Sequence, residues 1–115
     1  YTRIWSLTPK DTDNVSQTDT SDSSNYTTSS SVYGMEQAAA EVLDNQATAS
    51  WDSASGQNYA EWTKDNVIYK VWLEDSSSME ERLKLVTGNS LAGAAFWKLG
   101  FETSSIWDTV IKYIN

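Results

Sequence analysis

The sequence predicts an α+β fold in which an antiparallel sheet is followed by a helix, a covered strand and a second helix. Residues 48–73 contain three short runs of strand-favouring residues separated by turn signals, which is typical of an antiparallel meander. The run LAGAAFW, residues 91–97, is apolar without alternation, as in a strand of a parallel sheet that is covered on both faces. Such a strand needs parallel neighbours, and this chain offers almost none. The last third therefore indicates the end of a larger α/β barrel or sheet.

Composition limits the possible partners and chemistry. The chain has 115 residues, the size of one small domain, and 16 acidic against eight basic residues give a net charge of −8. We expect no nucleic-acid partner and no membrane partner, because phosphate binding needs clustered Lys and Arg, and no apolar run reaches the ~20 residues of a membrane span. With no cysteine and no histidine, we expect no metal and no cofactor, and any acid–base chemistry would fall to carboxylates. The chain opens on Tyr1, so we expect its true start to lie upstream.

The first half should contain one strand, one long loop and one helix. Residues 1–7 alternate as in a short strand, which Pro9 closes. Residues 11–31 are almost wholly polar and predict a flexible loop, because they bury too little apolar surface to offset their ordering entropy. A helix is expected over residues 35–45, with one apolar face. In the meander that follows, the rings of Trp51, Tyr59, Trp62 and Trp72 are expected to form a small core.

The last third should form a helix, a strand and a helix. The first helix has a capping box, Ser77 with Glu80 or Ser78 with Glu81, and Gly88 ends it. Glu74 and Asp75 could pass for a pair of catalytic carboxylates, but their place before SSSMEE favours helix capping. The strand is LAGAAFW. The second helix, SSIWDTVIKYIN, should turn Ile106, Val110 and either Tyr113 or Ile114 inward.

Five segments together resemble the C-terminal part of family 18 glycoside hydrolases, in particular the bacterial spore-germination type. These segments are YTRIW, SSSVYGMEQA, WDSASGQNYAEW, YKVWLED and LAGAAFWKLGFETSSIWDTV. The resemblance implies a fragment of a (β/α)8 TIM barrel that carries an α+β insertion subdomain. Residues 1–6 would end barrel strand seven, residues 7–74 would form the insertion, and residues 75–115 would supply helix seven, strand eight and helix eight. By pattern alone, residues 67–97 could instead be a strand–helix–strand crossover; the resemblance assigns VIYKVWL to the insertion's sheet.

The family's catalytic motif, D-x-x-D-x-D-x-E, is absent from this sequence. Its Glu is the general acid, and the acetamido group of the substrate acts as nucleophile. The nearest approach, Asp11-Thr12-Asp13, is followed at position 15 by Val, and the first Glu is Glu36. The resemblance therefore implies no catalytic residue in this chain, which we expect to be inactive alone.

Substrate contacts are what the resemblance carries over. Trp97 would form the aromatic floor beneath the sugar next to the scissile bond, and Arg3, with Tyr1 beside it, would lie at the rim of the cleft. Each residue has a structural alternative. Trp97 could be a core residue, although its place at a strand exit after Gly93, Ala94 and Ala95 favours stacking on a sugar. For Arg3, a structural ion pair and a ligand contact are equally good interpretations.

The sequence thus predicts a C-terminal fragment of a glycoside hydrolase that acts on N-acetylglucosamine polymers, either peptidoglycan or a chitin-like chain. Its expected partners are a glycan strand and the missing N-terminal part of the barrel, and exposed strand edges could also pair with a second copy. The expected location is extracellular, at a bacterial cell wall or spore. The alternatives are a stand-alone, non-catalytic carbohydrate- or wall-binding domain and a structural α+β domain whose aromatic residues are all core.

Overall fold

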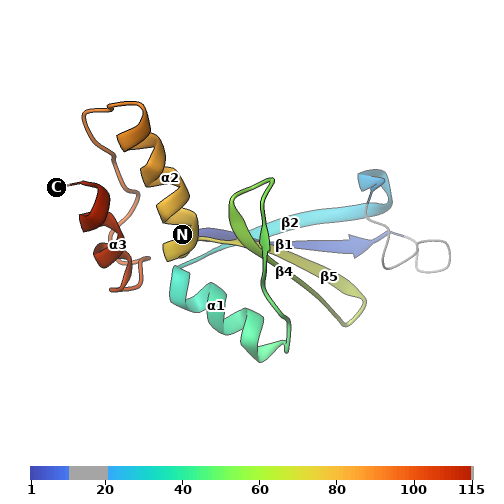
Figure 1. The fold of residues 1–115 in the computed structure, drawn as a ribbon. Coiled ribbons are helices and arrows are strands. Elements are labelled where there is room, and N and C mark those ends of the chain that lie inside the picture. The colour runs from blue at the N-terminus through green and yellow to red at the C-terminus, as the bar shows by residue number, and fades with distance from the viewer. Residues whose placement is uncertain (11–20, 115) are drawn as a thin grey trace.

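The computed structural model describes residues 1–10 and 21–114 and is built around one five-stranded antiparallel sheet (Figure 1). The strand order is β2-β1-β5-β4-β3. The strands are β1 (Thr2–Pro9), β2 (Tyr26–Tyr33), β3 (Ser50–Asp52), β4 (Gln57–Lys64) and β5 (Val67–Leu73). Because β5 pairs antiparallel with both β1 and β4, residues 67–73 belong to the antiparallel sheet and not to a parallel crossover. The predicted α+β class and meander are confirmed.

Helices lie on one face of the sheet and beyond one end of it (Figure 1). They are the α-helices α1 (Met35–Asp44), α2 (Ser76–Gly88) and α3 (Ile106–Tyr113), whereas the short 3-10 helix η1 (Ser23–Asn25) lies at the opposite end of the sheet, directly before β2. The helix α1 follows β2 directly and lies beneath the sheet. The helices α2 and α3 pack together at the end where β5 leaves the sheet, and the Tyr113 hydroxyl donates to Glu80 Oε1 at 2.8 Å. All three α-helices were predicted.

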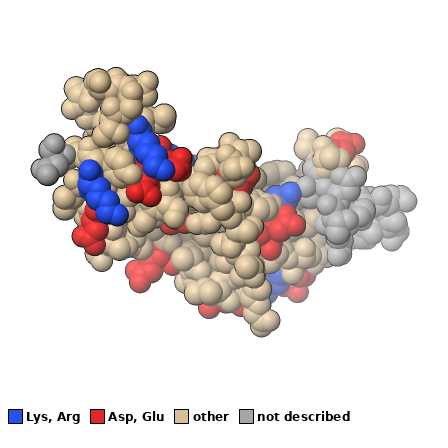
Figure 2. All heavy atoms as spheres, in the orientation of Figure 1, with Lys and Arg blue, Asp and Glu red and all other residues tan. Residues whose placement is uncertain are grey.

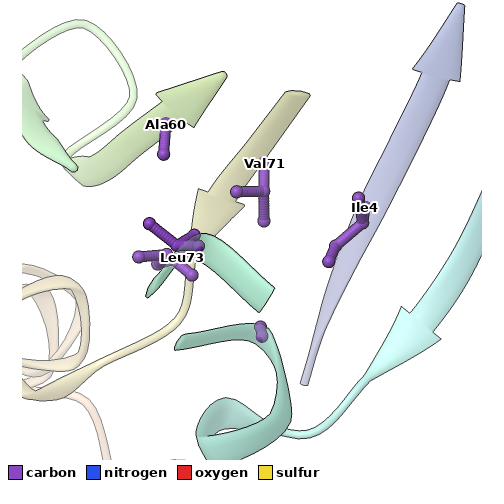
Figure 3. Close-up of a cluster of buried hydrophobic side chains, with 6 residues drawn as sticks. Ile4, Ala60, Val71 and Leu73 are labelled. Carbon is purple, nitrogen blue, oxygen red and sulfur yellow. The ribbon is translucent and has the colours of Figure 1, made fainter. Parts of the chain in front are cut away.

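The main core lies between the sheet and α1, and it is aliphatic. Ile4, Ala60 and Val71 come from three adjacent strands and point to the same side, with Leu73 beside them (Figure 3). Ala38 and Val42 of α1 complete the buried cluster. We call this side of the sheet the α1 face. Alternation along β1, β4 and β5 places apolar residues here, and their burial stabilises the fold by roughly 1.5–3 kcal/mol for each large side chain.

The prediction that four aromatic rings form the core is wrong for three of them. Trp62 packs against the buried cluster and stacks on Tyr69, with ring centroids 5.5 Å apart. Trp51 is 46% exposed on the short edge strand β3. Tyr59 and Trp72 lie opposite each other in the register and are only half-buried. Their odd–even position on the strands sends them to the face opposite α1, so they cannot join the core.

The polar segment predicted as a loop over residues 11–31 is shorter than expected at its C-terminal end. Residues 26–33 form the edge strand β2, with every residue from Tyr26 to Tyr33 in register with β1. Main-chain hydrogen bonds to β1 order a segment that is too polar to form a core, and the buried Tyr26 anchors its start. Residues 11–20, about half of the predicted loop, lie outside the described residues.

The run LAGAAFW, predicted as a strand, does not form one in this chain. No residue between Asn89 and Ser105 is in a helix or strand, and residues 91–97 are exposed. A strand covered on both faces needs hydrogen-bonding neighbours on its two edges. The described strands all belong to the antiparallel sheet, so none of them pairs with this run. Its assignment as a barrel strand stays a prediction, as does the domain boundary after residue 6, which falls inside β1.

The N-terminus of α2 is capped by Asp75, not by Ser77 or by a box that starts at Ser78. The Asp75 carboxylate accepts from the backbone N–H of Ser78 at 2.9 Å, and the Ser78 hydroxyl receives the Asp75 N–H at 3.0 Å. This reciprocal pair is a capping box that starts two residues before Ser77. The expectation that Asp75 serves helix capping is confirmed. Gly88 is the last residue of α2, as predicted.

Charged side chains of both signs are intermingled on the face that Figure 2 shows, and uncharged residues cover much of it. Among the described residues, no helix combines the length and the apolarity that crossing a bilayer requires. The described part of the chain also contains no cluster of three Asp or Glu side chains arranged to hold a metal ion.

Candidate saccharide-binding groove

A groove of about 690 Å³ lies where the sheet meets α2, α3 and the segment that connects them. It is lined by residues from the start of β1, the end of β5, both helices and residues 94–99. The three residues that the resemblance placed in a substrate cleft, Tyr1, Arg3 and Trp97, all line it. Residues almost a hundred positions apart in the sequence therefore meet in one cavity.

Arg3 and Tyr1 come from the N-terminal end of β1. Arg3 points to the sheet face opposite α1, because its neighbours Thr2 and Ile4 are buried on the α1 side. Its guanidinium donates to the Ser30 hydroxyl on β2 at 3.0 Å. Within the part of the chain that the structure describes, Arg3 forms no ion pair. Its remaining donors can therefore reach a ligand in the groove.

Trp97 is the most exposed aromatic side chain among the described residues, with 78% of its surface accessible. An indole in this state has a free flat face, which a core tryptophan would not have. Phe96, next to it, is half as exposed and meets Trp107 of α3 edge-on, with ring centroids 6.1 Å apart. The two neighbours thus have different environments, although they do not lie on a strand.

The segment that carries Trp97 is held to the sheet through Phe101. The Phe101 carbonyl accepts the backbone N–H of Met35 at 2.7 Å, at the point where β2 turns into α1. A Cβ at Gly34 would come within 3.2–3.4 Å of Phe101, which is tighter than an ordinary van der Waals contact, so glycine suits this close approach. The Phe101 ring lies 6.2 Å from Tyr1 and 5.1 Å from the Lys98 ammonium. This cluster couples one wall of the groove to the other.

The polar wall of the groove is an ion pair between Glu74 and Arg82. Glu74 follows β5 and Arg82 is on α2, and their atoms approach to 2.8 and 3.0 Å through both guanidinium nitrogens. Gln57 donates to Glu74 Oε1 at 2.8 Å, and Ser78 donates to its Oε2 at 3.1 Å. The bidentate geometry fixes Arg82 as a planar donor at the groove wall. This contact also ties α2 to the end of the sheet.

The two carboxylates of the groove that have shifted pKa values shift in opposite directions. Burial raises the pKa of Glu74, and this outweighs Arg82 and the Ser78 hydroxyl, which act to lower it. Glu102 accepts from backbone N–H groups, including that of Gly100 at 2.6 Å, and these bonds hold its pKa below the usual range. Both carboxylates are engaged in structural contacts. The groove is therefore equipped for binding by rings and hydrogen-bond donors.

Sequence reasoning missed several groove residues: Trp5, Trp72, Glu74 and Arg82. A signal for the tryptophans was present. Trp5 lies two positions after Arg3 on the same strand, so alternation puts both on one face. Trp72 lies two positions after the polar residue Lys70 on its strand, so alternation puts Trp72 on the same, non-core face as Lys70. The Glu74–Arg82 pair had no local signal, because it spans a strand end and a helix.

Comparisons with known proteins agree with this architecture. No family model matches the chain. A cortical fragment-lytic enzyme of Bacillus subtilis (strain 168) is 28% identical over 64 residues, which is 55% of this chain and 15% of that enzyme. The C-terminal domain of a Desulfitobacterium hafniense protein described as a chitinase has a TM-score of 0.74 at 17% identity, covering 98% of this chain and 33% of that chain. The spore cortex-lytic enzyme SleL of Bacillus megaterium has a TM-score of 0.71 at 15% identity, covering 99% and 24%.

The chain shares its fold with parts of chitinases and spore cortex-lytic enzymes. This agrees with the resemblance to the C-terminal part of family 18 glycoside hydrolases. The chain spans about a seventh of the length of the curated relatives it matches and a quarter to a third of the two solved chains.

Proposed function

We propose that this chain forms one wall of the saccharide-binding cleft of a glycoside hydrolase that acts on N-acetylglucosamine polymers, peptidoglycan or chitin-like. The observation that carries the proposal is the single groove that contains Tyr1, Arg3 and the exposed ring of Trp97. In this function Trp97 stacks beneath a sugar ring, and Arg3 donates hydrogen bonds at the rim. The chain contributes binding, and the catalytic acid lies on sequence outside it. The cell wall or the spore of a bacterium is the corresponding location.

The remainder of the barrel is the proposed neighbour of the exposed apolar residues around the groove. Leu91 and Leu99 flank the segment that carries Trp97, and Ile111 is on α3; all three are more than half exposed. Single exposed apolar side chains are ordinary, but three that are each more than half exposed at one helical end of a small chain are what a missing neighbour would cover. Parallel barrel strands on either side of residues 91–97 would satisfy the backbone groups of that run.

A stand-alone, non-catalytic carbohydrate-binding domain is the second candidate, because the groove is formed within this chain alone. The discriminating experiment joins the chain to the sequence upstream of Tyr1 and measures hydrolysis of a chromogenic N-acetylglucosamine oligomer. The hydrolase proposal predicts turnover that depends on a Glu in an upstream D-x-x-D-x-D-x-E motif. Oligomer binding without turnover in the longer protein would favour the binding domain.

The binding proposal itself is tested by titrating the 115-residue chain with the N-acetylglucosamine hexamer. Fluorescence and calorimetry should both report binding, and Trp97→Ala should weaken it. Trp51→Ala is the matched control, because Trp51 is also exposed but lies on the α1 face, outside the groove. An equal effect of the two substitutions, or no binding at all, would contradict the proposal.

A further inference from the structure

A second exposed tryptophan extends the groove along the sheet. Trp5 lies on β1 two residues after Arg3, so both side chains are on the face opposite α1, about 7 Å apart along the strand. Trp5 lines the same groove as Trp97, and 39% of its surface is exposed. A tryptophan in the middle strands of a sheet is normally covered by a packed layer. Here α1 covers the other face (Figure 1).

Hydrogen-bonding side chains surround Trp5. In the register it lies opposite Ser30 on β2 and opposite Lys70 on β5. Lys70 lies opposite Glu61 on β4, and their charged atoms are 4.0 Å apart. The hydroxyl of Ser30 receives the hydrogen bond from Arg3. Around the Trp5 ring, this face therefore offers hydrogen-bond donors and acceptors, among them two cationic side chains and one carboxylate.

This combination suits an uncharged sugar chain better than the apolar surface of a protein partner. Protein interfaces concentrate apolar residues and exclude charges from their centre. Trp5 instead has Arg3 on its own strand and the Lys70–Glu61 pair beside it. A pyranose presents a flat C–H face to a ring and hydroxyl and amide groups at its edge. The same ligand can therefore use both components.

Resting on the proposed function, we propose that Trp5 is the stacking platform of an additional sugar subsite, which holds a β-1,4-linked N-acetylglucosamine chain beyond the sugar that Trp97 binds. Arg3 and Ser30 supply polar contacts between the two rings. The sheet face opposite α1 thereby extends the groove, and longer oligomers bind more tightly than short ones because they reach Trp5.

The test compares N-acetylglucosamine dimer and hexamer binding to the 115-residue chain and to its Trp5→Ala, Trp97→Ala and Trp51→Ala variants. We expect Trp5→Ala to weaken hexamer binding about threefold to tenfold, the loss of one aromatic contact, and to leave dimer affinity within twofold. Trp97→Ala should weaken both ligands. Trp51→Ala should change neither. Thermal unfolding of each variant, and Trp5→Phe, which keeps a ring, control for loss of fold.

A measurement on the unsubstituted chain makes the test independent of the variants. The six tryptophans each give one indole N–H signal in a nitrogen–proton correlation spectrum. The hexamer should shift the Trp5 and Trp97 signals and leave the signals of Trp51 and Trp62, on the α1 face, in place. A Trp5 signal that stays still, or a Trp5→Ala variant that behaves like Trp51→Ala, overturns the subsite while Trp97 still responds. If Trp97 does not respond either, the proposed function itself fails.

Discussion

At the scale of single residues, Trp97 and Phe96 show how neighbours in sequence can serve different purposes. Trp97 turns most of its surface to solvent in the groove, whereas Phe96 meets Trp107 edge-on. An exposed ring adds little to stability, because its area is not removed from water. A ring that is available in this way can bind a ligand without weakening the fold.

We therefore predict that Trp97→Ala, in an enzyme that includes the upstream barrel, lowers kcat/KM about tenfold to a few hundredfold, corresponding to roughly 1.5–3 kcal/mol of lost contact. The free energy of unfolding should change by less than ~0.5 kcal/mol in the isolated chain, as for other surface positions. Phe96→Ala should destabilise by about 1–2 kcal/mol through loss of its ring contact, with nearly normal kcat/KM. Urea unfolding and steady-state kinetics measure both. The reverse pattern would exchange the two roles.

Glu74 gives a pH-dependent prediction. Burial raises its pKa in the folded chain above the ordinary value of 4.5. On acidification, the folded state takes up a proton at Glu74 at a higher pH than the unfolded chain does. The contribution of Glu74 to the free energy of unfolding therefore rises as the pH falls through the pKa of the folded state. It is fully present below the pKa of Glu74 in the unfolded chain.

Glu74→Gln removes this titration and keeps the size of the side chain. As the pH is lowered from 7 to 4.5, we expect the free energy of unfolding of the original chain to increase relative to that of the Gln variant. Urea denaturation at several pH values measures this difference, in which the other carboxylates largely cancel. A difference that shrinks toward low pH would mean that the Arg82 ion pair outweighs burial and that the pKa is lowered.

At the scale of elements, the start of α2 is organised by one side chain, Asp75. Asp75 caps the helix through Ser78 N–H, and its second oxygen accepts from Asn58 on β4 at 2.7 Å. One carboxylate therefore orders the helix and fixes it to the sheet. The Glu74–Arg82 pair lies directly beside this junction.

We predict that Asp75→Ala lowers the free energy of unfolding by about 1–2 kcal/mol, the upper part of the range for an N-cap. Ser77→Ala is the matched control, since Ser77 is exposed and belongs to the capping box that the structure does not contain. Its effect should stay within ~0.5 kcal/mol. Comparable losses for the two variants, measured by urea unfolding, would favour a cap at Ser77.

At the scale of the whole molecule, the sheet and the helical end form an elongated body of 56 × 27 × 21 Å, with the groove where the two parts meet. The carboxylates of that groove are held by Arg82 and by backbone N–H groups. A glycosidase of this kind needs a carboxylic acid free to give its proton to the leaving oxygen. The proposed wall of the cleft can bind a sugar without cleaving it.

We accordingly predict that the purified 115-residue chain releases no product from a chromogenic N-acetylglucosamine oligomer above background, although it binds the hexamer. Glu74→Gln and Glu102→Gln should leave this result unchanged. A discontinuous assay over pH 4–8 covers the range in which a carboxylic acid could act. Turnover that Glu74→Gln abolishes would place a catalytic acid in this chain and overturn the division between binding and catalysis.

Local pattern was enough for the elements whose stability comes from neighbours in sequence. The amphipathic faces of residues 35–45 and 104–115 and the strands at 57–63 and 67–73 were predicted within one or two residues, because period and turn chemistry specify them. The capping role of Asp75 followed from its place before a helix. The resemblance added Tyr1, Arg3 and Trp97, which the structure places in one groove; their contact with sugar remains a prediction.

Tertiary structure decided the features that depend on partners far away in the chain. Residues 26–33 became a strand because β1 supplies hydrogen bonds that their own polar sequence does not reveal. Residues 91–97 have the composition of a covered strand, but they form none here because no described strand pairs with them. Trp5, Trp72, Glu74 and Arg82 line one groove only after the sheet and α2 have assembled. A sequence specifies the local preference of each segment, and hydrogen-bonding and packing partners decide which preferences are realised.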